Sequence, residues 1–365
     1  MKALIAMSGG VDSSVAAFLM KQQGYECIGC TMKLFDAEDA CIKDTKTCCS
    51  LDDTEDARSV AIRLGMPFYV FNFKDDFRRK VIDSFVESYL KGQTPNPCID
   101  CNRYLKFDRL ITRAEELGCD VVVTGHYAKI VSDKNGYHLL RGADPAKDQS
   151  YVLYNLTQEQ LSKVRFPVGE LSKDQVRMIA AEQGFINAEK PDSQDICFVP
   201  DGDYASVIES RTGKKAVPGD FIDKEGNVIG HHKGIIHYTV GQRKGLGMGF
   251  GKPMFVLKTD PASNTVTLGD NEDLFSTDIR VRDVNWTCGH VPVNNSDMNA
   301  FTASPGIPCT AKIRYRQQAS PAVIIPQEDG SVILRFEQPQ RAATPGQSAV
   351  FYQGEELIGG GIIEV

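Results

Sequence analysis

The sequence predicts an α/β fold, a doubly wound and mostly parallel sheet followed by two small β domains. In the first part of the chain, short apolar runs alternate with amphipathic segments, which is the pattern of strand–helix units. After Gly213, glycines and prolines separate short runs that are typical of small β-barrels. The chain of 365 residues is also longer than one ordinary core requires. We therefore expect three domains, with boundaries at residues 1–210, 211–275 and 276–365.

Local signals place the elements of the first domain. Strands are predicted at residues 2–6, 26–33, 67–73 and 120–125. Helices are predicted at residues 13–21, 53–64, 75–90, 104–117, 173–183 and 204–210. Ser172 and Gln175 have the spacing of a capping box at the start of one of these helices. In such a sheet the ligand binds beyond the carboxyl ends of the strands.

The later part of the chain is expected to be β-rich, and one of its predicted strands carries basic side chains. Strands are predicted at residues 234–240, 254–258, 311–316, 331–336 and 349–353. Alternation in one of them would put Lys312, Arg314 and Arg316 on one face, at a spacing that suits a nucleic-acid backbone; a solvated face is the alternative. The glycine-rich run 240–252 opens no helix, so we interpret it as a basic loop that contacts phosphate.

Composition argues against a membrane-spanning or disulfide-stapled protein. No apolar run reaches the ~18 residues that a membrane span needs, and the N-terminal run is too short for a signal or transit peptide. Eleven cysteines without such a signal indicate reduced thiols and a cytoplasmic location. The net charge of −7 argues mildly against nucleic-acid binding, but residues 230–258 carry five Lys or Arg and no acidic residue.

A glycine turn directly after the first strand is the first candidate site. The segment SGGVDSS, residues 8–14, points backbone N–H groups and serine hydroxyls at the start of a helix, where phosphate binds well. Asp12 would repel a bare phosphate, so its carboxylate indicates phosphate chemistry with a magnesium ion or a substrate hydroxyl between them. The G-x-x-x-x-G-K-[ST] and G-x-G-x-x-G signatures are absent. An ordinary tight turn is the alternative.

Most of the cysteines are expected to pack in the interior. Cys27 and Cys30 lie at positions of one strand that face opposite sides of its sheet, so they cannot readily meet. Packing is also the default for three single cysteines, Cys119, Cys288 and Cys309. A metal site is a weaker alternative for the loop cysteines Cys41, Cys48 and Cys49.

Three other cysteines lie in segments where a chemical role is more natural than packing in the interior. Cys98 and Cys101 follow a stiff Pro-Asn-Pro segment, and Asn102 can cap the helix that we expect to follow. A thiol at a helix N-terminus is favoured as the nucleophilic thiolate. Cys197 lies in a polar loop near the end of the α/β part, where packing is a less natural role.

The motif SGGVDSS resembles the pyrophosphate loop of the ATP pyrophosphatase superfamily, whose fold is adenine nucleotide alpha hydrolase-like. Further blocks in the same order make the chain similar to the bacterial tRNA-specific 2-thiouridylases, which thiolate the wobble uridine of tRNA. These blocks are MSGGVDSSVAA, TPNPC..CN...KF, TGHYA, KDQSYVL, SQDICF, HYTVGQRKGLG, KIRYRQ and ATPGQ.

This resemblance implies a set of site residues. Cys101 matches the nucleophile, Cys197 the persulfide carrier, and Asp12 a residue of the metal or activation step. ATP, with Mg²⁺, is expected at Ala6, Met7, Ser8, Gly9, Gly10, Val11, Asp12, Ser13, Met32 and Gly125. The anticodon arm of tRNA is expected at Asn96, Pro97, Cys98, His126, Lys147, Asp148, Gln149, Arg314, Tyr315 and Gln347. The expected partners are tRNAs for Lys, Glu and Gln and a cysteine desulfurase or sulfur-relay protein.

The implied chemistry has a clear physical logic. Adenylation converts the C2 oxygen of uridine into a good leaving group, and a persulfide on Cys197 then supplies sulfur. Cys101 either releases hydrosulfide from that persulfide or resolves the bound intermediate, and both routes end in a Cys101–Cys197 disulfide. The target base must leave its stack to enter the pocket.

Three alternatives stay open at this point. Many relatives have aspartate where this chain has Cys98, so Cys98, Cys101 and Cys197 could together hold a [4Fe–4S] cluster. Another ligase or amidotransferase with the same loop is the second alternative, although such enzymes need no pair of loop cysteines. The third is an RNA-binding protein that has lost catalysis, against which the presence of Asp12 and the cysteines argues.

Overall fold

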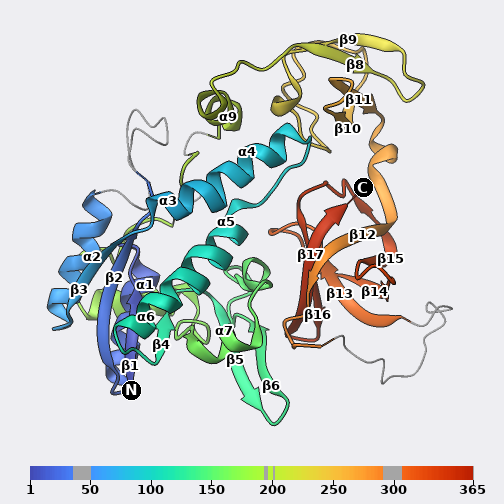
Figure 1. Cartoon of the computed structure of the whole chain (residues 1–365). Coiled ribbons are helices and arrows are strands. Elements are labelled where there is room, and N and C mark those ends of the chain that lie inside the picture. The colour runs from blue at the N-terminus through green and yellow to red at the C-terminus, as the bar shows by residue number, and fades with distance from the viewer. Residues whose placement is uncertain (36–50, 193–195, 200–201, 291–305, 365) are drawn as a thin grey trace.

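The first part of the chain is built on a parallel five-stranded sheet with the order β3-β2-β1-β4-β7 (Figure 1). This computed structural model describes all residues except 36–50, 193–195, 200–201, 291–305 and 365. The strands are β1 (Lys2–Ala6), β2 (Glu26–Lys33), β3 (Phe68–Asn72), β4 (Val121–Val123) and β7 (Val164–Arg165). The first four confirm the sequence predictions. Since β1 is followed by β2 on one side and has β4 on the other, the turn after β1 lies at the switch point where ligands bind in such sheets.

Helices cover both faces of this sheet. Ala3 and Ile5 of β1 pack with α1 (Val11–Gln22), α2 (Leu51–Arg63) and α8 (Lys173–Glu182). Leu4 points to the opposite face, where it joins a larger core with side chains of the helices between β3 and β4. Cys27 and Cys30 belong to these two different cores, as the alternation of a strand predicts, and burial raises the pKa of the Cys27 thiol to about 11.

Two helical runs form that second layer, and each contains a π-helical stretch, which is rare and often marks a functional site. The first run consists of α3 (Lys74–Phe77), η1 (Arg78–Ile82) and α4 (Asp83–Leu90), as the sequence predicts. The second consists of α5 (Pro97–Asp100), η2 (Cys101–Arg109) and α6 (Leu110–Glu116). Its predicted start at residue 104 is wrong. The run begins at Pro97 because Asn96, and not Asn102, caps it.

The C-terminal part closes into an antiparallel barrel of strands β12-β15-β14-β13-β16-β17, joined by the pair β12–β17. The strands are β12 (Phe275–Asn285), β13 (Ile307–Lys312), β14 (Ser320–Pro326), β15 (Val332–Arg341), β16 (Ser348–Gln353) and β17 (Glu356–Glu364). A hairpin of the first domain, β5 (Ala128–Asp133) and β6 (Gly136–Arg141), extends this sheet through the pair β17–β6. The two parts are therefore joined by backbone hydrogen bonds.

A smaller sheet with the order β10-β11-β8-β9 lies between these parts in the sequence. Its strands are β8 (Gly219–Ile222), β9 (Val228–His232), β10 (Phe255–Asp260) and β11 (Thr265–Gly269). The predicted strand at 234–240 is wrong, since Gly234 has a φ of 127° and leads into the short 3-10 turn η4 (Ile235–His237). The predicted strand at 311–316 is also wrong beyond Lys312, where the chain turns and Gln317 N donates to Arg314 O.

Short elements complete the described chain. They are η3 (Ser150–Leu153), α7 (Gln158–Lys163), α9 (Tyr204–Thr212) and η5 (Asn271–Leu274). No helix among the described residues is both long and apolar enough to cross a membrane.

Candidate nucleotide and cysteine site

The turn between β1 and α1 is closed by its own serines. Ser13 Oγ accepts a hydrogen bond from Ser8 N at 3.2 Å and donates to Gly10 O at 2.9 Å. Gly9 has a φ of 75°, a left-handed conformation that favours glycine. Gly10 caps α1 without a side-chain hydrogen bond, so the first N–H groups of the helix remain available at its positive end. This geometry suits a phosphate group.

The neighbours of this turn include other residues expected at the nucleotide. A Cβ on Gly125 would lie 2.7 Å from Asp12 C and 2.7 Å from Ser13 N, so only glycine fits there. Met7 is buried, and its carbonyl accepts a hydrogen bond from Thr31 Oγ1 at 2.7 Å. Met32 is half-buried near the end of β2, beside β1. The structure thus brings Gly125 to the loop and uses Met7 to anchor it.

Asp12 is the centre of a charged network. Lys173 Nζ lies 2.7 Å from Asp12 Oδ1 and 2.9 Å from Oδ2, and Tyr127 Oη donates to Asp12 Oδ1 at 2.7 Å. Lys173 also contacts Asp192 Oδ1 at 2.6 Å, and Lys147 contacts Asp192 Oδ2 at 2.7 Å. Burial alone would raise the pKa of Asp192, but the bonds from Lys147 and Lys173 lower it. Two ammonium groups and two carboxylates therefore alternate beside the loop.

Sequence reasoning missed Tyr127, Lys173 and Asp192. A signal for Lys173 was present, because it is the first residue of α8, directly after the capping residue Ser172. A lysine at a helix N-terminus opposes the helix dipole, so it is expected there only when another contact holds it. Two carboxylates supply that contact.

The cysteine pair Cys98 and Cys101 lies at the start of the second helical run. Asn96 Oδ1 accepts a hydrogen bond from Cys98 N at 3.1 Å, and Pro97 occupies the first turn. Cys98 is exposed and Cys101 is half-buried at the start of η2. The helix N-terminus therefore lies beside Cys98, and Cys101 lies about one turn further along the helix. The predicted cap at Asn102 would instead have placed the N-terminus after Cys101.

Asn102 has a structural role instead of the predicted capping role. It is 3% exposed, and its Nδ2 donates to Val152 O at 2.9 Å. Beside the cysteines, burial raises the pKa of Asp100 to about 6, although Ser84 and Arg103 oppose this shift.

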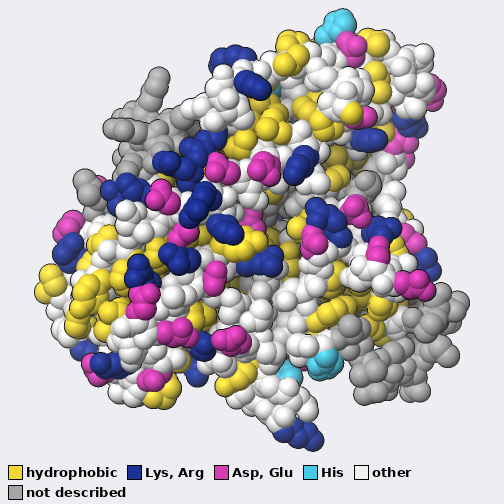
Figure 2. Space-filling model, viewed as in Figure 1, with side chains coloured by type: hydrophobic (Ala, Val, Ile, Leu, Met, Phe, Trp, Pro, Cys, Tyr) yellow, Lys and Arg dark blue, Asp and Glu magenta, His cyan; other side chains and the backbone are white. Residues whose placement is uncertain are grey.

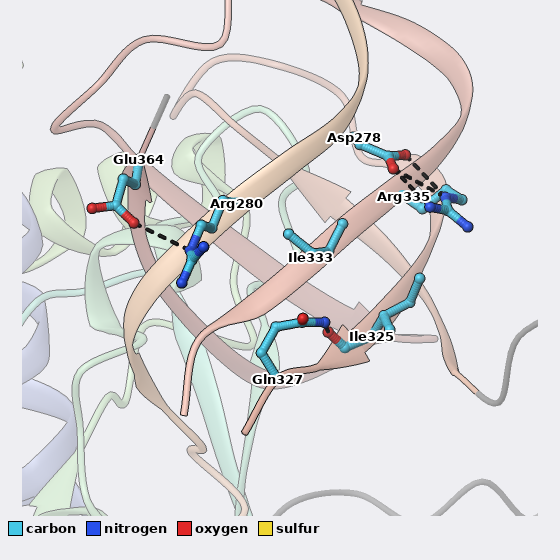
Figure 3. Close-up of a pocket in the computed structure, with 7 residues that line it drawn as sticks. All are labelled: Asp278, Arg280, Ile325, Gln327, Ile333, Arg335 and Glu364. Carbon is cyan, nitrogen blue, oxygen red and sulfur yellow. Dashed lines mark hydrogen bonds and ion pairs between the residues drawn. The ribbon is translucent and has the colours of Figure 1, made fainter. Parts of the chain in front are cut away.

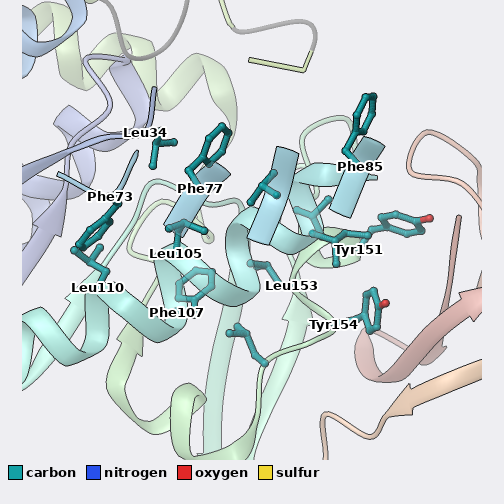
Figure 4. Packing of buried hydrophobic residues seen from close by; sticks show 14 of the residues in the cluster. Leu34, Phe73, Phe77, Phe85, Leu105, Phe107, Leu110, Tyr151, Leu153 and Tyr154 are labelled. Atoms are coloured by element: carbon teal, nitrogen blue, oxygen red, sulfur yellow. The ribbon is translucent and has the colours of Figure 1, made fainter. Parts of the chain in front are cut away.

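Cys197 packs against the same core as Cys101. Both half-buried side chains pack against one large cluster of buried residues, which includes Phe77, Phe85 and Leu105 (Figure 4). The ring of Phe198 packs edge-on against Phe77 and Phe85, with centroid distances of 5.8 and 5.3 Å. One hydrophobic core thus supports both predicted sulfur-bearing residues.

Residues 147–149 lie between the charged network around Asp12 and strand β13 of the barrel. Asp148 is buried and accepts hydrogen bonds from Gly142 N at 3.2 Å and Ser150 N at 3.0 Å. Gln149 Oε1 accepts from Tyr127 N at 3.1 Å. Asp148 therefore organises the backbone in this structure, while Lys147 pairs with Asp192.

His126 lies in the interior. Its Nδ1 is 2.6 Å from Thr124 Oγ1, and its Nε2 is 3.4 Å from Lys106 Nζ. Burial and the nearby Lys106 charge lower the pKa of His126 well below its usual value, so the ring is neutral.

The barrel residues expected at the RNA contact the first domain. Tyr315 is 36% exposed, and its ring centroid lies 5.8 Å from that of Tyr151. Burial raises the pKa of Tyr315, Asp148 raises it further, and Arg316 and a hydrogen bond with Gln149 oppose the shift. Gln347 Nε2 donates to Thr94 O at 2.7 Å, which ties the barrel to the loop before Cys98.

The predicted basic face of Lys312, Arg314 and Arg316 does not form. Lys312 is largely buried with its Nζ 3.8 Å from Asp148 Oδ2, and burial lowers its pKa. Arg314 Nη2 donates to Ala342 O at 2.8 Å and Thr344 Oγ1 at 3.2 Å. The strand ends at Lys312, so alternation does not continue to Arg316.

A face of mixed charge and a hollow on the barrel are two further features of the surface. On the face shown in Figure 2, Lys and Arg side chains are interspersed with Asp and Glu. A hollow of about 970 Å³ on the barrel is lined by Asp278, Arg280, Ile325, Gln327, Ile333, Arg335 and Glu364 (Figure 3). Its arginines are paired, Arg335 with Asp278 at 2.7 Å and Arg280 with Glu364 at 3.3 Å. None of the predicted site residues lines this hollow.

The metal alternatives differ in how well the residues fit. In the part of the chain that the structure describes, no three His, Cys, Asp or Glu side chains are placed to hold a metal ion. Cys98, Cys101 and Cys197 are all described, and they do not form such a group here. The loop Cys41, Cys48 and Cys49 lies outside the described residues. A Mg²⁺ ion bound with a nucleotide needs only one or two carboxylates besides the phosphates, and Asp12 fits that role.

Comparison with known proteins extends over the whole chain. Residues 1–201 match the tRNA methyl transferase HUP domain family. Residues 205–270 match the tRNA methyl transferase PRC-barrel domain, and residues 276–363 match the aminomethyltransferase beta-barrel domain. A solved 4-thiouridine synthetase–RNA complex with bound ATP covers 55% of this chain and 45% of its own, at a TM-score of 0.35 and 20% identity.

Full-length relatives are much more similar. The tRNA-specific 2-thiouridylase MnmA of Clostridioides difficile (strain 630) is 50% identical over 365 residues, covering 100% of this chain and 98% of the relative. The protein of the same name from Lachnoclostridium phytofermentans is 49% identical over 364 residues, covering 99% of both chains. At this identity and coverage the resemblance of the sequence motifs is confirmed. The chain belongs to the tRNA-specific 2-thiouridylase family.

Proposed function

We propose that this protein is an ATP-dependent tRNA sulfurtransferase that converts the wobble uridine to 2-thiouridine. The observation that carries the proposal is that the same molecule has two features. One is a turn with Asp12 beside it whose N–H groups are available to phosphate, and the other is a pair of half-buried cysteines, Cys101 and Cys197, that pack against one core. Its full-length relatives carry the 2-thiouridylase name at about half identity. A ligase or amidotransferase with the same loop is disfavoured, because those chemistries do not require the cysteine pair.

The loop and its charged neighbours serve the activation step. Uridine O2 attacks the α-phosphorus of ATP, and pyrophosphate leaves with the electron pair of the broken P–O bond. The N–H groups at the start of α1 stabilise the negative phosphates. Lys173 adds a positive charge beside them. Bound Mg²⁺, held by Asp12 and the phosphates, would supply further charge neutralisation.

The cysteines serve the sulfur transfer. In one route, the terminal sulfur of a Cys197 persulfide attacks C2, and AMP leaves with the C–O electron pair. The Cys101 thiolate then attacks Cys197 Sγ, which breaks the S–S bond and leaves its electron pair on the thiouridine sulfur. In the other route, Cys101 first releases hydrosulfide, which attacks C2. Both give a Cys101–Cys197 disulfide that a thiol must reduce.

Binding of the substrate requires contacts outside the loop. Asn96, Pro97 and Cys98 would border the extruded base, with Gln149 and Tyr315 beside them. His126, Lys147, Asp148, Arg314 and Gln347 are the other proposed tRNA residues; Gln347 would act through Thr94 O, by holding the loop before Cys98. The tRNAs for Lys, Glu and Gln are the proposed substrates. A cysteine desulfurase or a sulfur-relay protein would load Cys197.

A direct assay tests this function. The protein is incubated with ATP, Mg²⁺, a persulfide source and unmodified tRNA, and 2-thiouridine is resolved on a mercury-containing gel. Cys101→Ala and Cys197→Ala should each abolish the product, whereas Cys27→Ala should retain it as a matched control in the other core. Full activity of either of the first two variants would refute the cysteine assignment. Activity of iron-free protein would remove the cluster alternative.

A further inference from the structure

The carbonyl of Gly9 in the phosphate-binding turn is held by two side chains that no sequence motif singled out. Asn187 Nδ2 donates to Gly9 O at 2.9 Å, and Lys190 Nζ donates to the same oxygen at 3.3 Å. Asn187 Nδ2 also lies 2.9 Å from Ser14 Oγ, so one amide spans both ends of the turn. Both donors come from the short segment after α8.

That segment is itself rigidly placed. Phe185 is 4% exposed and packs in the core that contains α1 and β1. Ala188 N donates to Phe185 O, and Lys190 N donates to Asn187 O, both at 3.1 Å. Asn187 is 2% exposed. The segment is therefore an anchored turn and not a chance contact of surface side chains.

The first turn of α2 also packs against the phosphate-binding turn. A Cβ on Gly9 would lie 2.3 Å from Asp53 O, so the turn presses directly on the backbone of α2. Lys190 Nζ lies 2.5 Å from Asp53 Oδ1 and 2.6 Å from Asp56 Oδ2. Burial opposes the charge on Lys190, but these hydrogen bonds outweigh it and raise the pKa. Removal of Lys190 would take away the positive charge that these two carboxylates contact beside a turn that binds phosphate.

We propose that Asn187 and Lys190 are positioning residues that set the phosphate-binding face of this turn. A carbonyl oxygen that turned towards the phosphates would repel them, and it would also rotate the next N–H away. Two donors on Gly9 O fix that peptide so that its oxygen faces the 185–190 segment. Lys190 at the same time cancels the nearby acidic charge. The inference rests on the proposed function in taking ATP as the ligand of the turn.

The test measures ATP affinity directly, without tRNA. We expect Asn187→Ala and Lys190→Met each to raise the dissociation constant for ATP with Mg²⁺ about tenfold or more, since each removes a donor to a largely buried carbonyl. Asn187→Asp should be worse than Asn187→Ala, because a carboxylate cannot donate and brings negative charge to the turn. Lys190→Arg should recover most of the affinity. The dissociation constant for tRNA should stay within about twofold.

Arg63→Met is the matched control. Arg63 Nε donates to Gln183 O at 2.7 Å, which ties the same α2 to the end of the same α8, away from Gly9. We expect it to leave ATP affinity unchanged. Unaltered ATP binding in Asn187→Ala would overturn the inference, and so would a loss in Arg63→Met that equals the loss in Asn187→Ala. Failure of the thiolation assay with normal ATP binding would instead count against the proposed function alone.

Discussion

Lys173 and Asp12 form a two-oxygen ion pair, with the ammonium nitrogen 2.7 and 2.9 Å from the two carboxylate oxygens. The two residues are 161 positions apart in the chain, and both lie at the N-terminal turn of a helix. An acidic residue at such a position is common, but a lysine there is not. The pair therefore places one positive charge and one potential metal ligand next to the phosphate-binding turn.

Lys173→Met should reduce kcat/KM for ATP about 100-fold, which is the usual scale for loss of a fixed charged donor at a reacting phosphate or oxyanion. The rate should fall because Asp12 and Asp192 are then left without their shared cation. Lys163→Met is the control, since Lys163 also joins two carboxylates, Glu115 at 2.8 Å and Glu159 at 2.9 Å, on the surface. Equal losses in both variants would contradict a role for Lys173 at the nucleotide.

Gln347→Glu should slow thiolation about fivefold or more with little change in tRNA affinity, because a carboxylate cannot donate to Thr94 O. The loop that leads to Cys98 would then lose this tie to the barrel and keep the bond from Thr94 N to Pro345 O at 2.8 Å. Single-turnover rates and tRNA dissociation constants separate the two effects. Gln353→Glu, which breaks a similar bond to Pro308 O at the surface, should be neutral. Weakened tRNA binding with an unchanged rate would favour direct RNA contact by Gln347.

Lys312→Met should leave the salt dependence of tRNA binding unchanged, because this ammonium group lies against Asp148 and not at the surface. Arg316 is exposed, so Arg316→Met should lower the slope of log affinity against log salt by about one. Filter binding at several salt concentrations gives both slopes. If Lys312→Met lowered the slope as much as Arg316→Met, this result would support a basic face that includes Lys312.

His138→Gln should remove a pH-dependent part of stability at the hairpin–barrel contact. His138 Nδ1 lies 2.8 Å from Glu356 Oε1, and its Nε2 lies 3.0 Å from Asp133 Oδ1. Hydrogen bonds with Asp133 and Glu356 raise the pKa of His138 above its usual value. This stabilisation is therefore complete below the unfolded pKa of about 6.5 and is lost as the pH rises through the higher folded pKa. Melting temperatures across this range should converge for the two proteins at high pH; a constant difference would contradict this.

Local signals explain what could be predicted from the sequence. The strand, glycine turn and helix at the N-terminus lie within about twenty residues, and the capping box at Ser172 needs only four. The motif order placed Gly125 at the nucleotide turn, and the structure does bring it against Asp12 and Ser13. The strand, the turn, the helix and the capping box depend on neighbours in the chain, so a local pattern predicts them, whereas the placement of Gly125 followed from the family resemblance.

The predictions that were wrong, and the residues that were missed, depend on contacts between residues distant in the sequence. Asn102 looked like a cap, but Asn96 starts the helix earlier and leaves Asn102 to bond Val152 O. The alternation of side chains along a strand predicted that Lys312 contacts RNA. Alternation alone cannot show that Asp148 of another domain lies opposite Lys312. Asn187 and Lys190 lie 178 and 181 positions from Gly9 and belong to no recognisable motif. Such pairings arise only when the sheet and its helices have assembled.

The pairing of β17 with β6 has a consequence for synthesis on the ribosome. Leu357 and Glu356 are near the end of the chain, while their partners Leu139 and Leu140 emerge much earlier. Until β17 leaves the exit tunnel, the β5–β6 hairpin keeps a bare edge and the barrel stays open between β12 and β16. Completion of a single late strand therefore covers the exposed edges of β6, β12 and β16 at once, and a nascent or prematurely ended chain would carry all three as sites for aggregation.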